Sequence, residues 1–153
     1  MQKQSAGILL YRLNNDALEV FLVHLGGPFF ANKDDGSWSI PKGEFDDSEA
    51  PLVAARREFF EETGFVIEAE AAYTPLSLIK TASGRQVYAF ALEGDADPAT
   101  LTSNTFEIEW PPRSGMRQSF PEVDRGDWFS IAEAKKKLQP AQIPLLDELL
   151  TLL

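Results

Sequence analysis

The stretch of sequence that decides the fold runs from Gly43 to Phe65 and reads GEFDDSEAPLVAARREFFEETGF. Between Glu49 and Thr63 it contains no glycine, and its only proline, Pro51, falls in the first helical turn, where a missing N–H costs little. Gly64 follows at the position of a helix C-cap. The pattern therefore predicts a helix over Glu49–Thr63. The expected N-cap is Asp47 or Ser48, and the expected apolar face comprises Leu52, Ala55 and Phe59.

Three carboxylates, Glu58, Glu61 and Glu62, recur at positions i, i+3 and i+4 of this predicted helix. Residues at this spacing share one stripe roughly 100° wide, so their carboxylates lie close together. Ala54, one turn earlier, leaves the stripe uncrowded. Crowded anions repel one another and weaken a helix unless a cation lies between them. Since oxygen ligands suit the hard ions Mg²⁺ and Mn²⁺, the stripe is a predicted metal site.

The alternative interpretation of the stripe is an acidic helix face in solvent. We favour the metal site because of what surrounds the stripe. A Pro-Lys-Gly turn at residues 41–43 precedes the helix, Arg57 lies beside the carboxylates, and Gly64 ends the helix. Together they offer metal ligands, a cation and exposed backbone groups in one place.

The composition of the 153-residue chain, with 44% hydrophobic and 25% charged residues, is that of an ordinary globular protein, and we expect a single domain over residues 1–153. The chain has no cysteine, which excludes zinc ribbons, cysteine-ligated iron–sulfur clusters and cysteine nucleophiles. Its one histidine, His24, excludes a multi-histidine metal site and is expected to be structural.

The net charge of the chain is -10, from 14 Lys and Arg against 24 Asp and Glu. Such a chain is repelled by a nucleic-acid duplex and by an anionic membrane, so we expect neither as a partner. A small polyanionic ligand remains compatible if bound divalent cations reverse the local charge. The apolar run after Met1–Ser5 is too short for a signal peptide or a membrane span, which predicts a cytoplasmic location. The oligomeric state is left open.

Alternating and β-branched residues predict strands on both sides of the helix. Before it we expect a hairpin of Ala6–Leu13 and Leu18–Leu25, a short strand over Ser37–Ile40 and a loop over Lys42–Ser48. After it we expect strands over Pro75–Lys80, Arg85–Leu92, Thr105–Trp110 and Trp128–Ile131, a loop over Pro111–Pro121, a short helix from Ser130 to about Leu138 and a last helix over Ile143–Leu153. This irregular order predicts an α/β (α+β) fold in which helices cover the faces of a mixed sheet.

The stretch quoted above resembles the signature of the Nudix hydrolase family, G-x5-E-x7-R-E-U-x-E-E-x-G-U, where U is a bulky apolar residue. The matching residues are Gly43, Glu49, Arg57, Glu58, Phe59, Glu61, Glu62, Gly64 and Phe65. Seven fixed residue types coincide by chance at roughly one starting position in 10⁸. The resemblance implies a three-layer α/β/α sandwich with a mixed β-sheet over nearly the whole chain.

The resemblance also implies an activity, the Mg²⁺-dependent hydrolysis of the pyrophosphate bond in a nucleoside diphosphate linked to another moiety. The metal-binding and catalytic residues that it implies are Glu58, Glu61, Glu62 and, beside them, Arg57. One of the glutamates orients or deprotonates the attacking water, Arg57 and Glu49 brace the helix against the preceding loop, and the Gly43 carbonyl is a further metal ligand. Because metal ions neutralise phosphates and acidify bound water, no side-chain nucleophile is needed.

Many members of the family add an acid from a loop outside the signature. Glu122 is the expected residue here, because it lies shortly before Trp128 in an acidic segment that starts at Pro121. Glu107, Glu109 and Asp124 are the alternatives, and all four carboxylates can instead be surface residues.

Four residues are predicted to contact the substrate. Lys42 precedes Gly43 and is expected to touch a phosphate, with a surface lysine as the alternative. Trp38 and Tyr88 are predicted to stack on a base, as is Trp110, although an aromatic residue in a strand commonly belongs to the core.

The approach to the signature bears on the substrate. Residues 38–43, WSIPKG, resemble the W-x-x-P-K-G form of dinucleoside polyphosphate and diphosphoinositol polyphosphate hydrolases. An inositol polyphosphate requires a dense basic cleft, which the net charge disfavours, so we expect a nucleotide, with diadenosine tetraphosphate as the specific candidate. Three other interpretations are a non-hydrolytic nucleotide-sensing module of the same fold, an enzyme that removes RNA caps, and a purely structural acidic domain.

Overall fold

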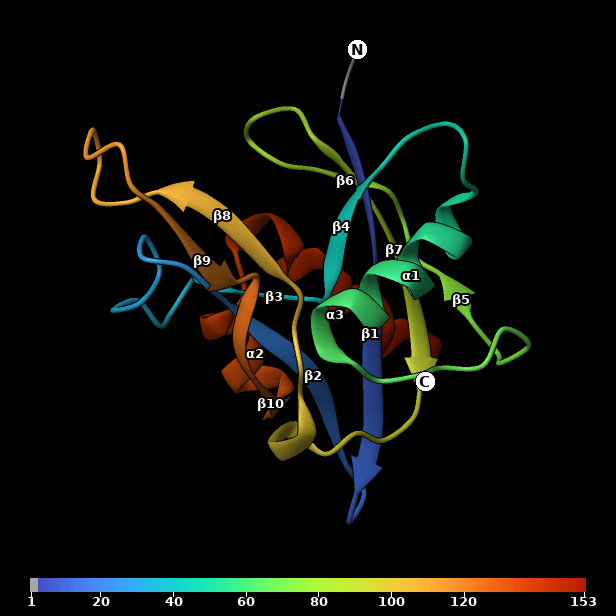
Figure 1. The fold of residues 1–153 in the computed structure, drawn as a ribbon. Coiled ribbons are helices and arrows are strands. Elements are labelled where there is room, and N and C mark those ends of the chain that lie inside the picture. Colours follow the sequence, from blue (N-terminus) through green and yellow to red (C-terminus); the bar gives the residue numbers. More distant parts are fainter. Residues whose placement is uncertain (1–2) are drawn as a thin grey trace.

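A mixed β-sheet forms the middle layer of the molecule, and helices cover both of its faces (Figure 1). The computed structural model describes residues 3–153, so Met1 and Gln2, where the expectation about the N-terminus begins, lie outside it. The sheet comprises β1 (Gln4–Asn14), β2 (Ala17–Leu25), β3 (Trp38–Ser39), β4 (Lys42–Phe45), β5 (Thr74–Pro75), β6 (Ile79–Lys80), β7 (Gln86–Glu93) and β10 (Val123–Ser130). The helices are α1 (Pro51–Thr63), α2 (Ile131–Lys137) and α3 (Ile143–Leu152), with short 3₁₀ turns η1 (Pro98–Thr100) and η2 (Pro140–Gln142).

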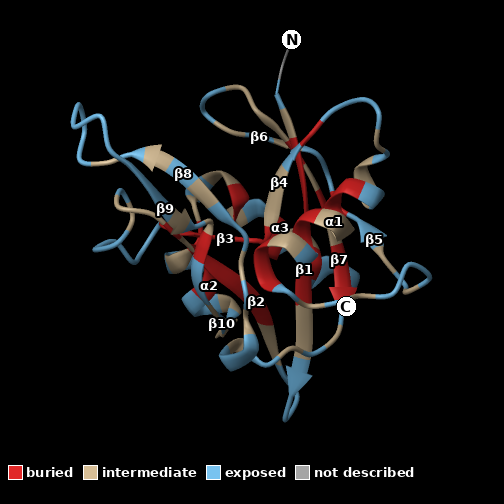
Figure 2. Ribbon diagram, in the orientation of Figure 1, coloured by how far each residue is buried: buried red, intermediate tan, exposed pale blue. Residues whose placement is uncertain are grey.

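The two faces of the sheet carry two separate hydrophobic cores, because successive side chains of a strand point to opposite faces. Ile8 of β1 and Phe21 of β2 pack under α1. Leu9 and Leu22, their neighbours in sequence, pack on the other face with α2 and α3. Figure 2 shows the buried residues along these central strands. The predicted α/β/α sandwich with a mixed sheet is therefore confirmed.

β4 shares one edge of β1 with β2, although its residues were predicted as a loop. The pairing of β1 with β2 runs from Tyr11 opposite Val20 to the hairpin end. The first residues of β1 are therefore free on that edge, and β4 pairs with them antiparallel, with Gly43 opposite Ala6. The loop prediction was wrong because this strand contains one buried residue, Phe45, and no alternation that marks a strand.

Helix α1 begins at Pro51, and its N-cap is Ala50, which offers no side-chain hydrogen bond. The prediction of Asp47 or Ser48 as N-cap was wrong, because the backbone N–H of Ser48 donates to Asp46 Oδ1 at 2.8 Å in a local turn. The C-cap prediction is confirmed: Gly64 is left-handed, with φ 76°, and its N–H donates to the Phe60 carbonyl.

The last third of the chain contains more strand than predicted. β8 (Thr105–Glu109) and β9 (Arg117–Pro121) form a separate two-stranded sheet, so the last part of the expected loop over residues 111–121 is a strand. β10 starts at Val123, five residues before the predicted strand, and it pairs with β2. The expected strand over residues 75–80 is divided between β5 and β6, which both pair with β7. Polar side chains dominate β9, which hid it from a search for hydrophobic alternation.

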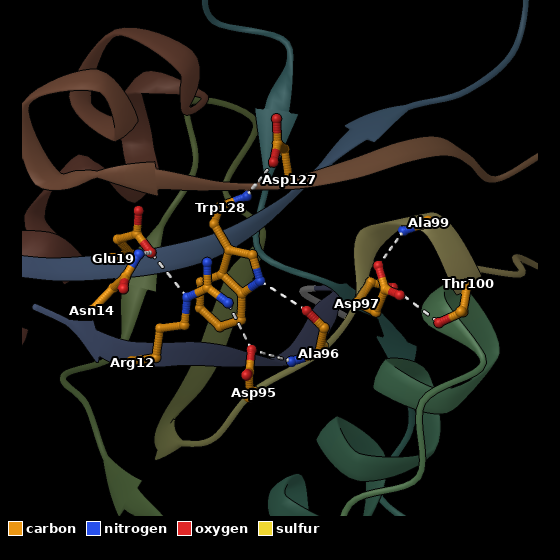
Figure 3. A network of polar contacts seen from close by, with 10 residues as sticks. All are labelled: Arg12, Asn14, Glu19, Asp95, Ala96, Asp97, Ala99, Thr100, Asp127 and Trp128. Atoms are coloured by element: carbon orange, nitrogen blue, oxygen red, sulfur yellow. Dashed lines mark hydrogen bonds and ion pairs between the residues drawn. The ribbon is translucent and has the colours of Figure 1, made fainter.

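A polar network fastens the end of the sheet that is remote from β4 (Figure 3). The Arg12 guanidinium lies 4.1 Å from the centroid of the Trp128 ring and pairs with Glu19 and Asp95 at 2.9 and 2.7 Å. Trp128 Nε1 donates to the Ala96 carbonyl at 2.9 Å. These contacts join β1, β2, β10 and the segment after β7. Arg12 lies six residues along β1 from the β4 pairing at Ala6, about 20 Å at the rise of a strand.

Candidate active site

The carboxylates of the predicted stripe lie where α1 packs against β4. Glu58 and Glu62 are 6% and 9% exposed, whereas Glu61 is half-buried. Phe59 and Ala55, on the adjoining helix surface, are fully buried against the sheet and fix the rotation of α1. This rotation turns the stripe toward β4 instead of bulk solvent.

Arg57 binds three of the acids. Its Nε and Nη2 donate to the two carboxylate oxygens of Glu49 at 2.9 and 2.8 Å, a bidentate pair that joins α1 to the loop before it. Its Nη1 donates to Glu58 at 2.8 Å and to Glu61 at 3.1 Å. The hydrogen bond from Arg57 lowers the pKa of Glu49. Arg57 thus orients the carboxylates of Glu58 and Glu61 and braces the loop through Glu49.

β4 approaches the carboxylates through its backbone. A Cβ atom added to Gly43 would lie 1.9 Å from Glu58 Oε2, so only glycine allows this approach. One position earlier, the backbone N–H of Lys42 donates to Glu62 Oε1 at 3.1 Å. β4 therefore holds Glu62 by a hydrogen bond and leaves room for Glu58.

Glu122 brings a fourth carboxylate to the site from the junction of β9 and β10. Its backbone N–H donates to the Asn104 carbonyl at 2.8 Å, and its carbonyl accepts the N–H of Gly26 at 2.9 Å. Asn104 in turn donates its own N–H to the Glu61 carbonyl at 2.8 Å, which links this junction directly to α1. A side chain at Gly26 would overlap the carbonyl of Pro121, with 2.0 Å between the atoms.

The other three candidates for the loop acid have different partners. Glu107 lies 3.7 Å from Arg117 and Glu109 accepts the backbone N–H of Arg113, both on the exposed hairpin. Asp124 Oδ1 lies 2.8 Å from Nδ1 of His24. Of the four residues, the structure brings Glu122 toward the acids of α1.

The electrostatics of the site reflect the burial of several anions together. Burial raises the pKa of Glu62 to about 8, with Glu122 and Glu58 adding to the rise and the hydrogen bond from the Lys42 backbone opposing it. Burial likewise raises the pKa of Glu58 and of Glu122, and the charge of Glu61 adds to both shifts. Burial and neighbouring negative charge therefore make Glu58, Glu62 and Glu122 harder to ionise.

The donor set fits a hard divalent cation. Within residues 3–153 no three acidic or imidazole side chains already surround a common metal position, and Arg57 lies between Glu58 and Glu61. The four carboxylates nevertheless offer only oxygen, burial opposes the ionisation of Glu58, Glu62 and Glu122, and the missing side chain of Gly43 lets Glu58 approach the backbone of β4. A cation beside them would favour their ionised forms.

The predicted substrate contacts have different outcomes. Lys42 is half-buried, and burial lowers its pKa beside Glu62. Trp38 is 4% exposed, packs on Phe129 with ring centroids 4.9 Å apart, and belongs to the core under α2 and α3. The base-stacking prediction for Trp38 was wrong because the indole is buried in this core, where it contacts His24 and Phe129. Tyr88 is half-buried and meets Phe45 edge-on, 5.8 Å between centroids, on the α1 side.

Sequence reasoning did not identify one residue and one contact that shape this site. Gly26 allows the close approach of the Glu122 segment, and the signal that could have found it is the Gly26-Gly27 pair. The hydrogen bond between His24 and Asp124, 100 residues apart, left no mark in the sequence.

Comparisons with known proteins identify the family and agree with the fold. A family model described as NUDIX domain matches residues 1–149. The NUDIX domain of Shewanella oneidensis NrtR, complexed with ADP ribose, has a TM-score of 0.67 at 16% identity, covering 99% of this chain and 88% of that one. A C. elegans Ap4A hydrolase binary complex has a TM-score of 0.62 at 19% identity, with 98% and 96% covered. A mutT/nudix family protein from Listeria innocua has 0.63 at 18%, with 98% and 92% covered. No curated protein sequence matches.

The chain belongs to the Nudix family. Its membership, with every specified residue of the signature present, makes it a pyrophosphohydrolase. No helix within residues 3–153 has both the length and the apolar character needed to cross a bilayer.

Proposed function

We propose that this chain hydrolyses the pyrophosphate bond of a nucleoside diphosphate linked to another moiety, with Mg²⁺, or alternatively Mn²⁺, held by Glu58, Glu61 and Glu62. The Gly43 carbonyl and Glu122 are proposed as further ligands. The observation that carries the proposal is the gathering of carboxylates from α1 and from Glu122 beside the backbone of β4, with raised pKa values.

Each residue of the site has a distinct proposed role. A bound divalent ion would neutralise the pyrophosphate and acidify a water molecule. Arg57 keeps Glu58 and Glu61 oriented through its two hydrogen bonds, and its bidentate contact with Glu49 prevents the helix from shifting against the loop. Burial raises the pKa of Glu62 to about 8, so in the metal-free site this carboxylate can hold a proton at neutral pH.

The proposed partner is a small-molecule nucleotide, which is the substrate. Neither duplex nucleic acid nor a membrane is proposed as a partner. Lys42 is proposed to contact a phosphate because its side chain lies next to the acids, on the strand that carries Gly43. Tyr88, half-buried on the same side of the sheet as α1, is the proposed base contact. Diadenosine tetraphosphate is the specific candidate, supported by the Trp38–Gly43 motif and by the fold shared with an Ap4A hydrolase. The proposed location is the cytoplasm.

The test is a substrate panel with Mg²⁺: nucleoside triphosphates, dinucleoside polyphosphates, ADP-ribose and other nucleotide sugars, with products resolved by chromatography. The Glu62→Gln variant is the control, because it keeps the shape of the side chain and removes its charge. We expect cleavage of dinucleoside tetraphosphates above the others, abolished in the control. Cleavage that survives in Glu62→Gln would overturn the metal assignment, and binding of nucleotides with no cleavage of any would favour a sensing role.

A further inference from the structure

His24, the only histidine in the sequence, is fully buried near the end of β2 and contacts two separate segments. Its Nε2 lies 2.6 Å from the carbonyl oxygen of Lys33, in the loop over residues 26–36. Its Nδ1 lies 2.8 Å from Asp124 Oδ1. The ring thus contacts a backbone carbonyl through one nitrogen and a carboxylate through the other. His24 therefore ties the loop to the start of β10.

Asp124 is the extra residue of a β-bulge. In the pairing of β10 with β2, Val123 lies opposite Leu25 and Arg125 opposite His24, so two steps along β10 correspond to one along β2. The bulge changes the face of the sheet on which the following residues of β10 lie. Val123 and Gly126 are three residues apart, which puts residues of a regular strand on opposite faces, yet both lie on the α1 side, where Phe21 packs against Gly126.

The bulge adjoins the backbone of Glu122. Glu122 is held on one side by Gly26, whose N–H donates to its carbonyl at 2.9 Å, and the next residue, Val123, donates its N–H to Ser103 Oγ at 3.1 Å. Asp124 supplies the next anchor along the chain through His24. The Asp124 carboxylate is 29% exposed, whereas the His24 ring is fully buried, so the rigid partner in this contact is the histidine.

The surroundings of the ring show that it is held firmly. The Trp38 indole meets it edge-on at 5.3 Å, and Trp38 Nε1 donates to Asp34 Oδ1 at 2.8 Å. Asp34 also binds Lys137 of α2 at 2.6 Å. The Arg125 guanidinium lies 5.2 Å from the Trp38 ring centroid and 3.7 Å from Asp124 Oδ1. The side of His24 away from the carboxylates is thus anchored to the α2 layer.

We infer that His24 is a positioning residue for the proposed reaction: by fixing the Asp124 bulge from inside the sheet, it holds the backbone of Glu122 so that this carboxylate faces the acids of α1. The inference rests on the proposed function and assigns this task to the Nδ1 contact. The Nε2 contact with Lys33 fastens the loop instead. The two roles are separable because the two nitrogens serve different segments.

Two substitutions separate the contacts. His24→Asn retains an amide nitrogen near the position of Nδ1 and loses the contact with Lys33, whereas His24→Gln retains one near Nε2 and loses the contact with Asp124. Asn also removes more packing than Gln does. If the ring has a purely structural role, His24→Asn should impair the protein more than His24→Gln. If the ring positions Glu122, His24→Gln should impair activity more than His24→Asn.

The first readout is the Mg²⁺ concentration that gives half-maximal cleavage, measured with kcat and KM on the best substrate. We expect His24→Gln to raise that concentration about tenfold, which is the loss of metal affinity typical when a group that supports a metal ligand is removed. The KM for the nucleotide should change little. His24→Asn should stay within about twofold of the parent. Asp124→Ala should raise the Mg²⁺ concentration as much as His24→Gln does. The double variant His24→Gln/Asp124→Ala should raise it no further than Asp124→Ala alone, because the two substitutions remove the same contact.

The second readout needs neither metal nor substrate. Hydrogen exchange at the Gly26 amide, which donates to the Glu122 carbonyl, should accelerate in metal-free His24→Gln and Asp124→Ala and stay unchanged in His24→Asn. Equal acceleration in His24→Asn and His24→Gln, or none in His24→Gln, would overturn the inference. A parent protein that cleaves nothing and binds no Mg²⁺ would refute the proposed function, while the exchange rates would still decide whether His24 positions Glu122.

Discussion

At the scale of single residues, Gly43 shows how a backbone can make room for a functional side chain. The atom that would meet a Cβ at this position is the end of the Glu58 side chain, which can move at little cost to folding. Gly43 is therefore needed for the placement of a carboxylate more than for stability, and this distinction can be measured.

Replacing Gly43 by alanine should leave the protein folded and impair its activity. Glu58 must move because a Cβ would lie 1.9 Å from its carboxylate oxygen, so we expect the affinity for Mg²⁺ to fall at least about tenfold. Thermal unfolding should change by only a few degrees. Calorimetric titration with Mg²⁺ measures the first effect. Gly94→Ala, which meets only the Leu10 side chain at 3.1 Å, is the control and should bind Mg²⁺ like the parent.

The raised pKa of Glu62 predicts the pH dependence of metal-free stability. The unfolded chain releases this proton near 4.5 and the folded protein near 8, so the folded state binds more protons between these values. The contribution of protonated Glu62 to the free energy of unfolding is therefore fully present below about pH 4.5. This contribution is lost as the pH rises to about 8, by at most about 1.4 kcal/mol for each pH unit.

Thermal unfolding with and without Mg²⁺ checks this expectation. Mg²⁺ should stabilise the protein more at about pH 8 than at about pH 6, because binding requires the ionised carboxylate. Glu62→Gln should flatten this dependence in the metal-free protein. An equal stabilisation by Mg²⁺ at both pH values would be incompatible with Glu62 as a ligand.

At the scale of elements, α1 has two functions on adjoining surfaces. One surface packs on the sheet through Phe59, which is fully buried, and the next carries the carboxylates. The helix needs this packing because its N-cap, Ala50, offers no side-chain hydrogen bond and its first turn contains no acidic residue. Tertiary contacts, and the Arg57–Glu49 pair, therefore hold the helix in place.

Two neighbouring phenylalanines of α1 test this account. Phe59 is 0% exposed and Phe60 is 52% exposed, although they are adjacent in sequence. We expect Phe59→Ala to lower the free energy of unfolding by about 3–5 kcal/mol, because it leaves a cavity between α1 and the sheet. Phe60→Ala should change it by less than about 0.5 kcal/mol. Denaturant titration of both variants decides, and similar losses would contradict the assigned rotation of the helix.

At the scale of the whole molecule, the layer of α2 and α3 is joined to the sheet by polar as well as apolar contacts. The Gln142 side chain, 1% exposed, accepts the Ile40 N–H at 3.0 Å and donates to Ser39 Oγ at 2.9 Å. These bonds hold the segment that leads into β4. The remote layer therefore helps to support the strand that carries Gly43.

Removing this amide should destabilise the fold. Gln142→Ala leaves a buried N–H and a buried hydroxyl without this partner, and we expect a loss of about 1–3 kcal/mol in the free energy of unfolding. Gln118→Ala, at an exposed residue of β9, is the control and should cost less than about 0.5 kcal/mol. A Gln142 variant as stable as the control would show that apolar packing alone holds this layer.

Prediction from the sequence succeeded where the pattern is local. The helix, its glycine C-cap and the spacing of its acids repeat within a few turns, so they are visible in the residues between Glu49 and Gly64. It failed for β4, β9 and the start of β10, which are polar and acquire their conformation by pairing with distant strands. Trp38 failed for a related reason, since its burial depends on α2 packing over it.

The sequence by itself determined that a helix presents Glu58, Glu61 and Glu62 together, because helical periodicity is a property of the local backbone. Only the tertiary structure decided that Gly43 lies against Glu58 and that, of the four candidate acids, Glu122 joins them. These contacts span tens of residues of chain and are made by the pairing of β4 with β1 and of β10 with β2. Pairing between distant strands depends on the packing of the whole sheet, and no short stretch of sequence encodes it.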